Sequence, residues 1–290
     1  MPWSLEHGMI VRRFGAGPEL LWLHGLGEWS PNFDAVAAHP ALAGFTHVLP
    51  DLPGYGRSPW PDEEEDATRD ARDERGAPDV RDDRTGDDRT GDDRTGDGRT
   101  GDGRALDALV GHLVGWLGDR RPALVGASMG GVLATLIAER TAVRAVVNID
   151  GNISLGDCSF SGKAAAYAID DFIASGFTAL RADVYEAGRT DLALRGYHAA
   201  LSAASPRMFH RHARELVELS RAEQLAPRFA ALRAPALFVA GLPGGICERS
   251  RALLDRHAVR WIGLAPAGHW VHRDQPDAFA AAVAAFLRDT

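Results

Sequence analysis

Short apolar segments alternate with segments of helical periodicity along most of the chain, and this alternation constrains the fold more than any other feature. Apolar residues recur at helical spacing over residues 105–119, whereas residues 145–147 and 236–241 lie in short, continuously apolar segments. Strands of the latter kind are buried on both faces, which is typical of parallel sheets covered by helices. The sequence therefore predicts an α/β fold with a mostly parallel, doubly wound sheet.

The alternating segments also predict the domain organisation. We expect strands over residues 9–15, 19–25, 122–128, 143–150, 236–241 and 259–265, and a strand that ends in a turn over residues 46–56. We expect helices over residues 105–119, 129–140 and 276–289. Strand signals stop between residues 151 and 225, where helical periodicity and aromatic residues prevail. We expect a helical cap at 151–225, between core segments 1–150 and 226–290. Most aromatic side chains of the cap should pack in its own core, and the others should face a pocket.

Residues 61–104 differ from the rest of the chain in composition. They contain 17 Asp and Glu against 9 Arg, which accounts for the whole formal net charge of −8. Within them, residues 82–103 repeat a five-residue unit without any aliphatic residue. Such a segment has too little apolar surface to offset the entropy of ordering, so we expect a disordered, low-complexity insertion. A docking tail or a lid over an active site is the alternative.

The remaining composition limits the expected compartment and partners. Cys158 and Cys247 are too few for a disulfide framework. The first residues lack the apolar stretch of a signal peptide, and no apolar run reaches the length of a spanning helix. Outside residues 61–104 acidic and basic residues balance, so nothing indicates a nucleic-acid or membrane partner. We expect a cytoplasmic protein, and the sequence leaves its oligomeric state open.

The pattern Gly126-x-Ser128-x-Gly130 lies between an expected strand and an expected helix. A serine on a sharp strand-to-helix turn has a strained backbone, and glycines two positions away on either side avoid collisions with neighbouring elements. The turn would place the Ser128 hydroxyl at the carboxyl edge of the sheet, beside a helix N-terminus that favours negative charge. Ser128 is therefore the candidate nucleophile, and a tightly packed Gly/Ser turn is the alternative.

Four segments together resemble the α/β-hydrolase superfamily. They are LHGLGE at 23–28, DLPGYGRS at 51–58, GASMGG at 126–131 and GHWVHRDQPDAF at 268–279. The similarity covers nearly all of the chain except residues 61–104, and the four motifs occur in the order of the family. The resemblance implies the α/β-hydrolase fold with a helical cap. It says little about the substrate, because this fold hosts many chemistries.

The resemblance also implies an oxyanion hole and a base. A tetrahedral oxyanion needs preorganised donors, and the backbone N–H groups of Leu26 and Met129 occupy the positions of the family's donors. His24 should pack beneath this oxyanion loop. His269, in the loop between the last strand and the last helix, matches the family's base, and His272 is its nearest competitor.

Two further pairs of residues have candidate binding roles. Trp29 and Trp270 flank the expected site and are candidates for the wall of a substrate pocket, which suggests a substrate with an apolar portion. His210 and His212 form an HxH pair on an expected helix. Because residues two apart point to different sides of a helix, we expect solvent-exposed histidines and no metal site.

The acid of the catalytic triad is not where the family usually places it. Many members carry it three residues past the glycine that matches Gly241, but here that position is Gly244. In part of the superfamily, including haloalkane dehalogenases, the acid stands at the end of the preceding strand. In this sequence the residue at that position is Asp150. That strand should lie beside the strand that leads to Ser128, and an aspartate buried there needs a partner such as the base. The alternatives are that Glu248 is the acid, or that Asp150 only caps a turn and the site has no functional acid.

Together these residues predict a serine hydrolase that cleaves a carboxylic ester or a related acyl bond of a small-molecule substrate. Ser128 would attack the carbonyl, His269 would take its proton, and Asp150 would orient His269, without a metal or organic cofactor. Carbon–carbon bond hydrolysis or acyl transfer on the same triad is one alternative. A ligand-binding protein that has lost turnover is another. Dehalogenation is disfavoured, because it requires a carboxylate nucleophile.

Overall fold

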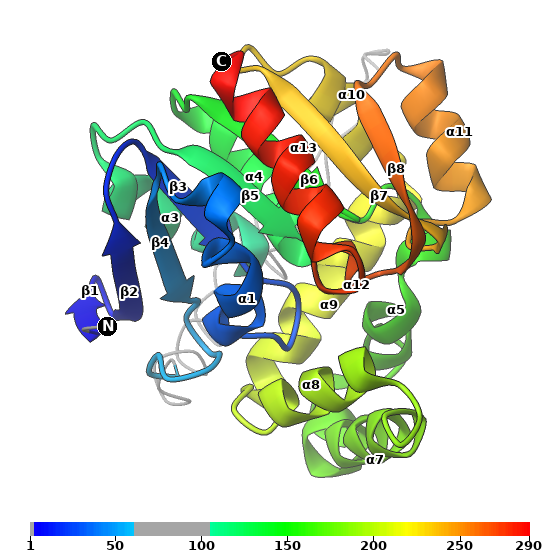
Figure 1. Cartoon of the computed structure of the whole chain (residues 1–290). Helices are drawn as coiled ribbons and strands as arrows, with labels where there is room; N and C mark the ends of the chain where they lie inside the picture. Colours follow the sequence, from blue (N-terminus) through cyan, green and yellow to red (C-terminus); the bar gives the residue numbers. More distant parts are fainter. Residues whose placement is uncertain (1–2, 61–104) are drawn as a thin grey trace, which may run out of the picture. The chain divides into compact units, whose positions relative to one another are not determined.

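The computed structural model describes residues 3–60 and 105–290, which form an eight-stranded sheet with the order β1-β2-β4-β3-β5-β6-β7-β8 (Figure 1). The expected insertion at 61–104, with its repeat, lies outside the described residues. The pairs β1–β2 and β2–β4 are antiparallel, and every other neighbouring pair is parallel. The sheet is therefore mostly parallel, as the continuously apolar segments predict.

Every expected strand is present within a few residues of its expected bounds. The strands are β1 (Trp3–Glu6), β2 (Met9–Gly15), β3 (Glu19–Leu23), β4 (Thr46–Asp51), β5 (Ala123–Ala127), β6 (Ala145–Ile149), β7 (Ala236–Gly244) and β8 (Trp261–Gly268). Sequence reasoning missed β1, because this edge strand is short and mostly exposed and so has no run of buried apolar residues.

Helices cover both faces of the sheet. Those of the core are α1 (Asp34–Ala37), α3 (Ala105–Leu117), α4 (Met129–Arg140), α11 (Glu248–Arg256), α12 (Val271–Asp274) and α13 (Pro276–Arg288). Successive residues of β3 alternate between two apolar cores: Leu21 and Leu23 join α3 and α4 in one core, whereas Leu20 and Trp22 join α1 and α13 in the other. None of the helices in the described residues is long and apolar enough to cross a membrane.

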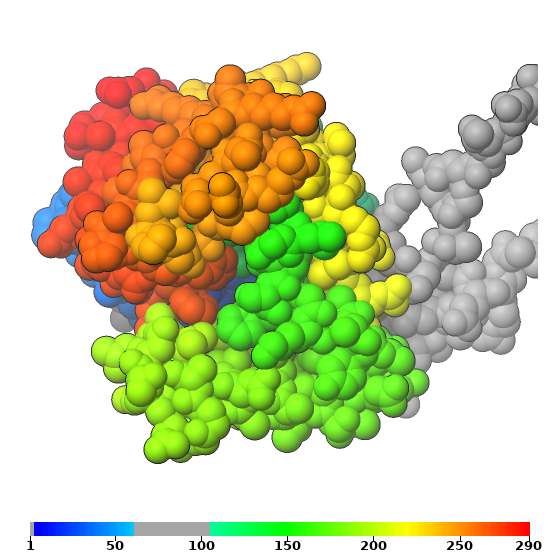
Figure 2. Space-filling view, turned by 90° about the vertical axis from the view of Figure 1, so that its right-hand side faces the viewer, coloured from blue at the N-terminus to red at the C-terminus, as the bar shows by residue number. Residues whose placement is uncertain are grey.

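The chain between β6 and β7 is helical, and we call residues 155–230 the cap. It contains η3 (Leu155–Asp157), α5 (Ser159–Ala165), α6 (Ile169–Asp171), η4 (Phe172–Gly176), α7 (Phe177–Ala187), α8 (Leu192–Leu201), α9 (Pro206–Arg221) and α10 (Leu225–Ala230). Phe172, Phe177 and Phe209 pack against one another with ring centroids 5.6–5.9 Å apart. Figure 2 shows much of the cap, in green to yellow-green, as a lobe against the orange and red C-terminal part of the core.

The two histidines of the HxH pair on α9 are buried, so the expectation of solvent-exposed side chains is wrong. Nε2 of His210 lies 2.9 Å from the backbone oxygen of Tyr167, and Nδ1 of His212 lies 2.7 Å from the hydroxyl oxygen of Tyr55. The two side chains do point to different sides, but α9 contacts α5 on the cap and α3 on the core, so both sides are covered. Among the described residues, no group of three or more His, Cys, Asp or Glu side chains could hold a metal ion.

Candidate active site

Ser128 occupies a tight turn between β5 and α4, with φ 53° and ψ −120°. A non-glycine residue held in this left-handed region costs about 1–3 kcal/mol, so the surroundings must enforce it. Both flanking glycines are required by close backbone contacts. A methyl group on Gly126 would lie 2.0 Å from the carbonyl oxygen of Gly130, and one on Gly130 would lie 1.9 Å from that of Leu23. The strand–turn–helix context predicted for Ser128 is present.

Backbone hydrogen bonds join the carboxyl ends of three neighbouring strands. The N–H of Ser128 donates to the carbonyl oxygen of Ile149 at 2.8 Å, and the N–H of Asp150 donates to that of Val239 at 3.1 Å. β6 pairs with β5 on one side, as expected, and with β7 on the other. Asp150 has φ 44°, so it shares the left-handed backbone of Ser128. The chain therefore turns sharply at Asp150, directly beside the turn that carries Ser128.

The carboxylate of Asp150 is fully buried, against Gly241 of β7 and Gly245 directly after that strand. The N–H of Gly241 donates to both of its oxygens, at 3.0 and 3.2 Å. A methyl group on Gly245 would lie 2.5 and 2.6 Å from these oxygens, so only glycine leaves room for them. The loop that lacks an acid of its own thus accommodates one from β6.

Burial raises the pKa of Asp150 well above its ordinary value, and the backbone N–H groups of Gly241 and Ile246 oppose this shift. Backbone donors alone do not balance a buried negative charge. A neighbouring group that can become positively charged would favour the ionised form of Asp150.

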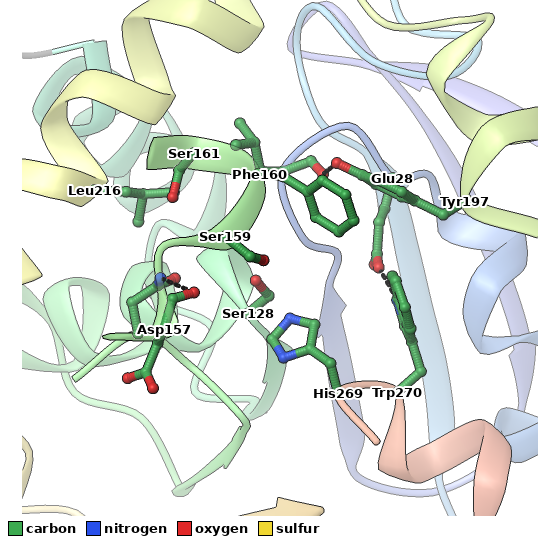
Figure 3. A pocket seen from close by; sticks show the side chains of 12 residues that line it. Glu28, Ser128, Asp157, Ser159, Phe160, Ser161, Tyr197, Leu216, His269 and Trp270 are labelled. Carbon is green, nitrogen blue, oxygen red and sulfur yellow. Dashed lines mark hydrogen bonds between the residues drawn. The ribbon is translucent and has the colours of Figure 1, made fainter. Parts of the chain in front are cut away.

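His269 follows directly after β8, and its ring lies beside the side chain of Ser128 (Figure 3). The preceding residue is fixed by Asp274, whose Oδ2 accepts the N–H of Gly268 at 2.8 Å. The Asp274 carboxylate thereby holds the loop that presents the His269 ring.

Asp150 and the loop of His269 meet at one point beside β7. A methyl group on Gly241 would lie 3.1 Å from Oδ2 of Asp150 and 2.0 Å from the carbonyl oxygen of Gly268. Within the described residues, no hydrogen bond joins the ring of His269 to Ser128 or to Asp150. Catalytic hydrogen bonds are often long without substrate, so this geometry is compatible with a triad that tightens on binding.

Burial lowers the pKa of His269 below its ordinary value, and the carboxylates of Glu28 and Asp157 oppose this shift. The ring is therefore neutral at pH 7, as a base must be. Asp157 is engaged elsewhere: its carboxylate accepts hydrogen bonds from the N–H groups of Ile153, Ser154 and Cys247 and from the hydroxyl of Ser250. These contacts fix the turn at η3 and the start of α11.

The competing candidates lie away from this pair. The ring of His272 is buried against Phe33 and Phe279, at centroid distances of 5.2 and 6.1 Å. Burial lowers the pKa of His272 to about 4. Glu248 is exposed at the first residue of α11. Neither residue lines the pocket that contains Ser128 and His269.

The expected oxyanion loop follows β3. Among the backbone hydrogen bonds of the described residues, none is donated by the N–H groups of Leu26 or Met129. The ring of His24 packs beneath the loop: its Nδ1 lies 2.9 Å from the carbonyl oxygen of Gly25, and its Nε2 accepts the N–H of Leu52 at 2.9 Å. The His24 ring therefore fixes the backbone at the start of this loop.

Glu28 is a buried acid at this site that sequence reasoning missed. The residue is 2% exposed, one carboxylate oxygen accepts the N–H of Gly25 at 3.0 Å, and the other accepts Nε1–H of Trp270. Glu28 thus connects the oxyanion loop to the residue that follows His269. The available signal was an acid directly after HGLG, which follows the apolar residues 20–23.

Ser128 and His269 line a pocket of about 30 Å³ between the core and the cap (Figure 3). The cap contributes Phe160, Tyr197 and Leu216 to its wall, and the Tyr197 hydroxyl is held by a 3.0 Å hydrogen bond to the carbonyl oxygen of Leu26. Such a volume holds little more than one or two water molecules, so a substrate must be small or must displace part of the cap.

The two tryptophans near the site differ in position. Trp270 lines the pocket, in contact with Tyr197 at a centroid distance of 5.6 Å. Trp29 is not among the lining residues, and its ring lies under the guanidinium of Arg57 at 5.5 Å. Trp270 alone of this pair therefore contacts the pocket.

A mostly parallel eight-stranded sheet in this order, with a sharp serine turn after β5, defines the α/β-hydrolase class of fold. The chain belongs to the alpha/beta hydrolase family, whose sequence profile matches residues 20–282. None of the curated proteins matches the sequence.

Solved structures of similar fold come from several enzymes. The enol-lactonase from Burkholderia xenovorans LB400 is 16% identical, with a TM-score of 0.68 over 99% of this chain and 100% of that chain. A thermophilic esterase from Thermogutta terrifontis is 17% identical, with a TM-score of 0.68 over 97% and 94%. The meta-cleavage product hydrolase from Pseudomonas fluorescens IP01 is 18% identical, with a TM-score of 0.65 over 100% and 98%. At these identities the similarity concerns the fold.

Proposed function

We propose that the protein is a serine hydrolase that cleaves a carboxylic ester or a related acyl bond, with Ser128 as nucleophile, His269 as base and Asp150 as the acid. One observation carries the proposal: the carboxylate of Asp150 and the residue before His269 contact the same point beside Gly241. The ring of His269 in turn lies beside Ser128 in a shared pocket. Ser128, Asp150 and His269 thus follow three strands at one edge of the sheet, which supports their assignment to a catalytic triad.

In the proposed reaction, Oγ of Ser128 attacks the substrate carbonyl while His269 accepts the hydroxyl proton. The N–H groups of Leu26 and Met129 stabilise the oxyanion, a contribution of about 3–4 kcal/mol for each donor. His269 then gives its proton to the leaving alcohol, and the acyl group stays on Ser128. A water molecule deprotonated by His269 releases the acid and restores the hydroxyl.

Asp150 is proposed to act through His269. When the ring takes a proton, its positive charge would stabilise the buried carboxylate, and the carboxylate would stabilise the imidazolium. The Gly241 N–H fixes the orientation of the Asp150 carboxylate. Carbon–carbon bond hydrolysis and acyl transfer would use the same three residues, so a 1,5-diketone substrate and an alcohol acceptor are also tested.

The test is fluorophosphonate labelling combined with turnover of 4-nitrophenyl esters of increasing acyl length. We expect one labelled serine, fastest turnover for short acyl groups because the pocket is small, and complete loss of both in Ser128→Ala. Ser175→Ala, at an exposed serine of the cap, is the matched control and should behave as the wild type.

Labelling that persists in Ser128→Ala would refute the assignment of the nucleophile. Labelling without turnover of any ester, together with cleavage of a vinylogous 1,5-diketone, would move the function to carbon–carbon bond hydrolysis. Product that forms only when an alcohol acceptor is added would indicate acyl transfer.

A further inference from the structure

The pocket beside Ser128 contains a buried carboxylate that the proposed mechanism does not use. A methyl group on Gly25 would lie 3.1 Å from Cδ of Glu28 and 3.1 Å from Cβ of Ser128, so the two side chains flank the same point. In Figure 3 Glu28 projects toward Trp270 in the wall of the pocket. A substrate bound to Ser128 would therefore lie close to the Glu28 carboxylate.

The charge of this carboxylate has no cation opposite it in the pocket. Glu28 and Asp157 are acidic, whereas neither lysine nor arginine is present among the residues that line the described pocket. Asp157 accepts four hydrogen bonds, three at Oδ2 and one at Oδ1, whereas Glu28 accepts one N–H on each oxygen, so a lone pair remains on each for a ligand. In a site with little water, such a charge acts strongly on a charged ligand.

A second buried acceptor in the same pocket has no partner. Asn152 is 4% exposed and lines the pocket. Its Nδ2 donates to the carbonyl oxygen of Asp157 at 3.3 Å, whereas its Oδ1 has no hydrogen-bond partner within the described residues. A buried carbonyl oxygen without a donor is costly, so a ligand that brings an N–H group would be stabilised there.

We propose that Glu28 and Asn152 make the pocket selective for substrates that carry an ammonium or another N–H donor group, and against substrates that carry a carboxylate. The inference deepens the proposed function and rests on it in one respect, namely that the pocket beside Ser128 holds the substrate. An anionic group would meet the Glu28 carboxylate without a compensating cation, whereas an ammonium group would donate to either acceptor.

The test measures binding without turnover. Butylammonium, 1-butanol and butyrate share a four-carbon chain and differ in charge, so they are titrated by ligand-detected NMR at pH 7 into the full-length Ser128→Ala protein. We expect butylammonium to bind at least about tenfold more tightly than butyrate, with 1-butanol in between. Equal binding of the two ions, or tighter binding of butyrate, would overturn the proposal.

Substitutions then locate the effect. Adding Glu28→Gln, which removes the charge at constant size, should reduce the preference for butylammonium over butyrate by about tenfold, whereas the exposed control Glu248→Gln should leave it unchanged. Asn152→Ala should weaken butylammonium and leave butyrate unaffected. A preference that survives Glu28→Gln would exclude Glu28 as its source.

Two controls distinguish failure of this proposal from misfolding of a variant and from failure of the proposed function. If Glu28→Gln does not fold, as judged by its thermal unfolding, the ranking of the three probes in the Ser128→Ala protein still decides the proposal. If the wild type neither reacts with fluorophosphonate nor hydrolyses esters, the proposed function fails, whereas the binding preference is measured independently of it.

Discussion

Gly245 determines whether the carboxylate of Asp150 can occupy the loop after β7. A methyl group added to Gly245 would collide with both carboxylate oxygens, and Gly241 supplies the N–H that orients them. A carboxylate on this loop would have to compete for the same space. The glycines of this loop therefore leave the space that the carboxylate of Asp150, after β6, occupies.

Gly245→Ala should displace this carboxylate. The new methyl group would lie 2.5 Å from Oδ2 of Asp150 and 2.5 Å from the carbonyl oxygen of Gly241, so we expect a loss of stability of about 1–3 kcal/mol. Labelling by fluorophosphonate should slow by at least about tenfold if Asp150 supports His269.

The control for this variant is Gly115→Ala in α3, where an added methyl group meets no atom within 4 Å. Alanine is the better helix former, so this change should leave labelling unchanged and raise stability by up to about 1 kcal/mol. Urea unfolding and labelling rates provide both readouts. A Gly245→Ala protein with wild-type stability and reactivity would contradict the contact with Asp150.

At the residue scale, the sequence predicted what backbone geometry dictates and missed what only packing reveals. The glycines around Ser128 predicted the turn because close backbone contacts admit no side chain there. Glu28 was missed because its role depends on Trp270, which is distant in sequence and follows another strand. No local pattern reports such a contact.

At the scale of elements, α9 shows that helical periodicity predicts the direction of a side chain but not whether another element covers it. Its polar residues His210 and His212 point to different sides, as expected, but each side meets another helix. The prediction that both histidines are solvent-exposed was wrong because the sequence does not show which helices pack against α9. The short edge strand β1 was missed for a related reason, since its pairing with β2 rather than its composition makes it a strand.

Burial lowers the pKa of His212 to about 3, with the nearby Arg211 acting in the same direction, and the ordinary value is 6.5. The unfolded chain therefore binds a proton that the folded chain does not, and stability is lost as the pH falls from 6.5 toward 3. This residue should contribute a slope of about 1.4 kcal/mol per pH unit in that range.

His212→Asn removes the titrating group and can keep a hydrogen bond to the hydroxyl of Tyr55. We expect its free energy of unfolding to fall less steeply between pH 6.5 and 4.5 than that of the wild type, by about 1.4 kcal/mol per pH unit. Urea titrations at several pH values in this range measure the difference. Parallel curves for the two proteins would show that His212 does not carry the acid sensitivity.

At the scale of the whole molecule, the sheet brings together residues that are far apart in sequence. Ser128, Asp150 and His269 follow β5, β6 and β8, and β7 with the residue after it supplies the glycines that accommodate the carboxylate. The order of the motifs predicted this fold, because family members share the strand order. The roles of the three residues remain a proposal, to which the geometry lends support.

The most direct measurement compares fluorophosphonate labelling rates for the wild type, Asp150→Asn, His269→Ala and the double variant. If the three residues act as one unit, Asp150→Asn should react about 10²- to 10⁴-fold more slowly than the wild type. The double variant should then be no slower than His269→Ala, because Asp150 acts through the ring. An Asp150→Asn protein that reacts as fast as the wild type, while Glu248→Gln is inert, would contradict the account.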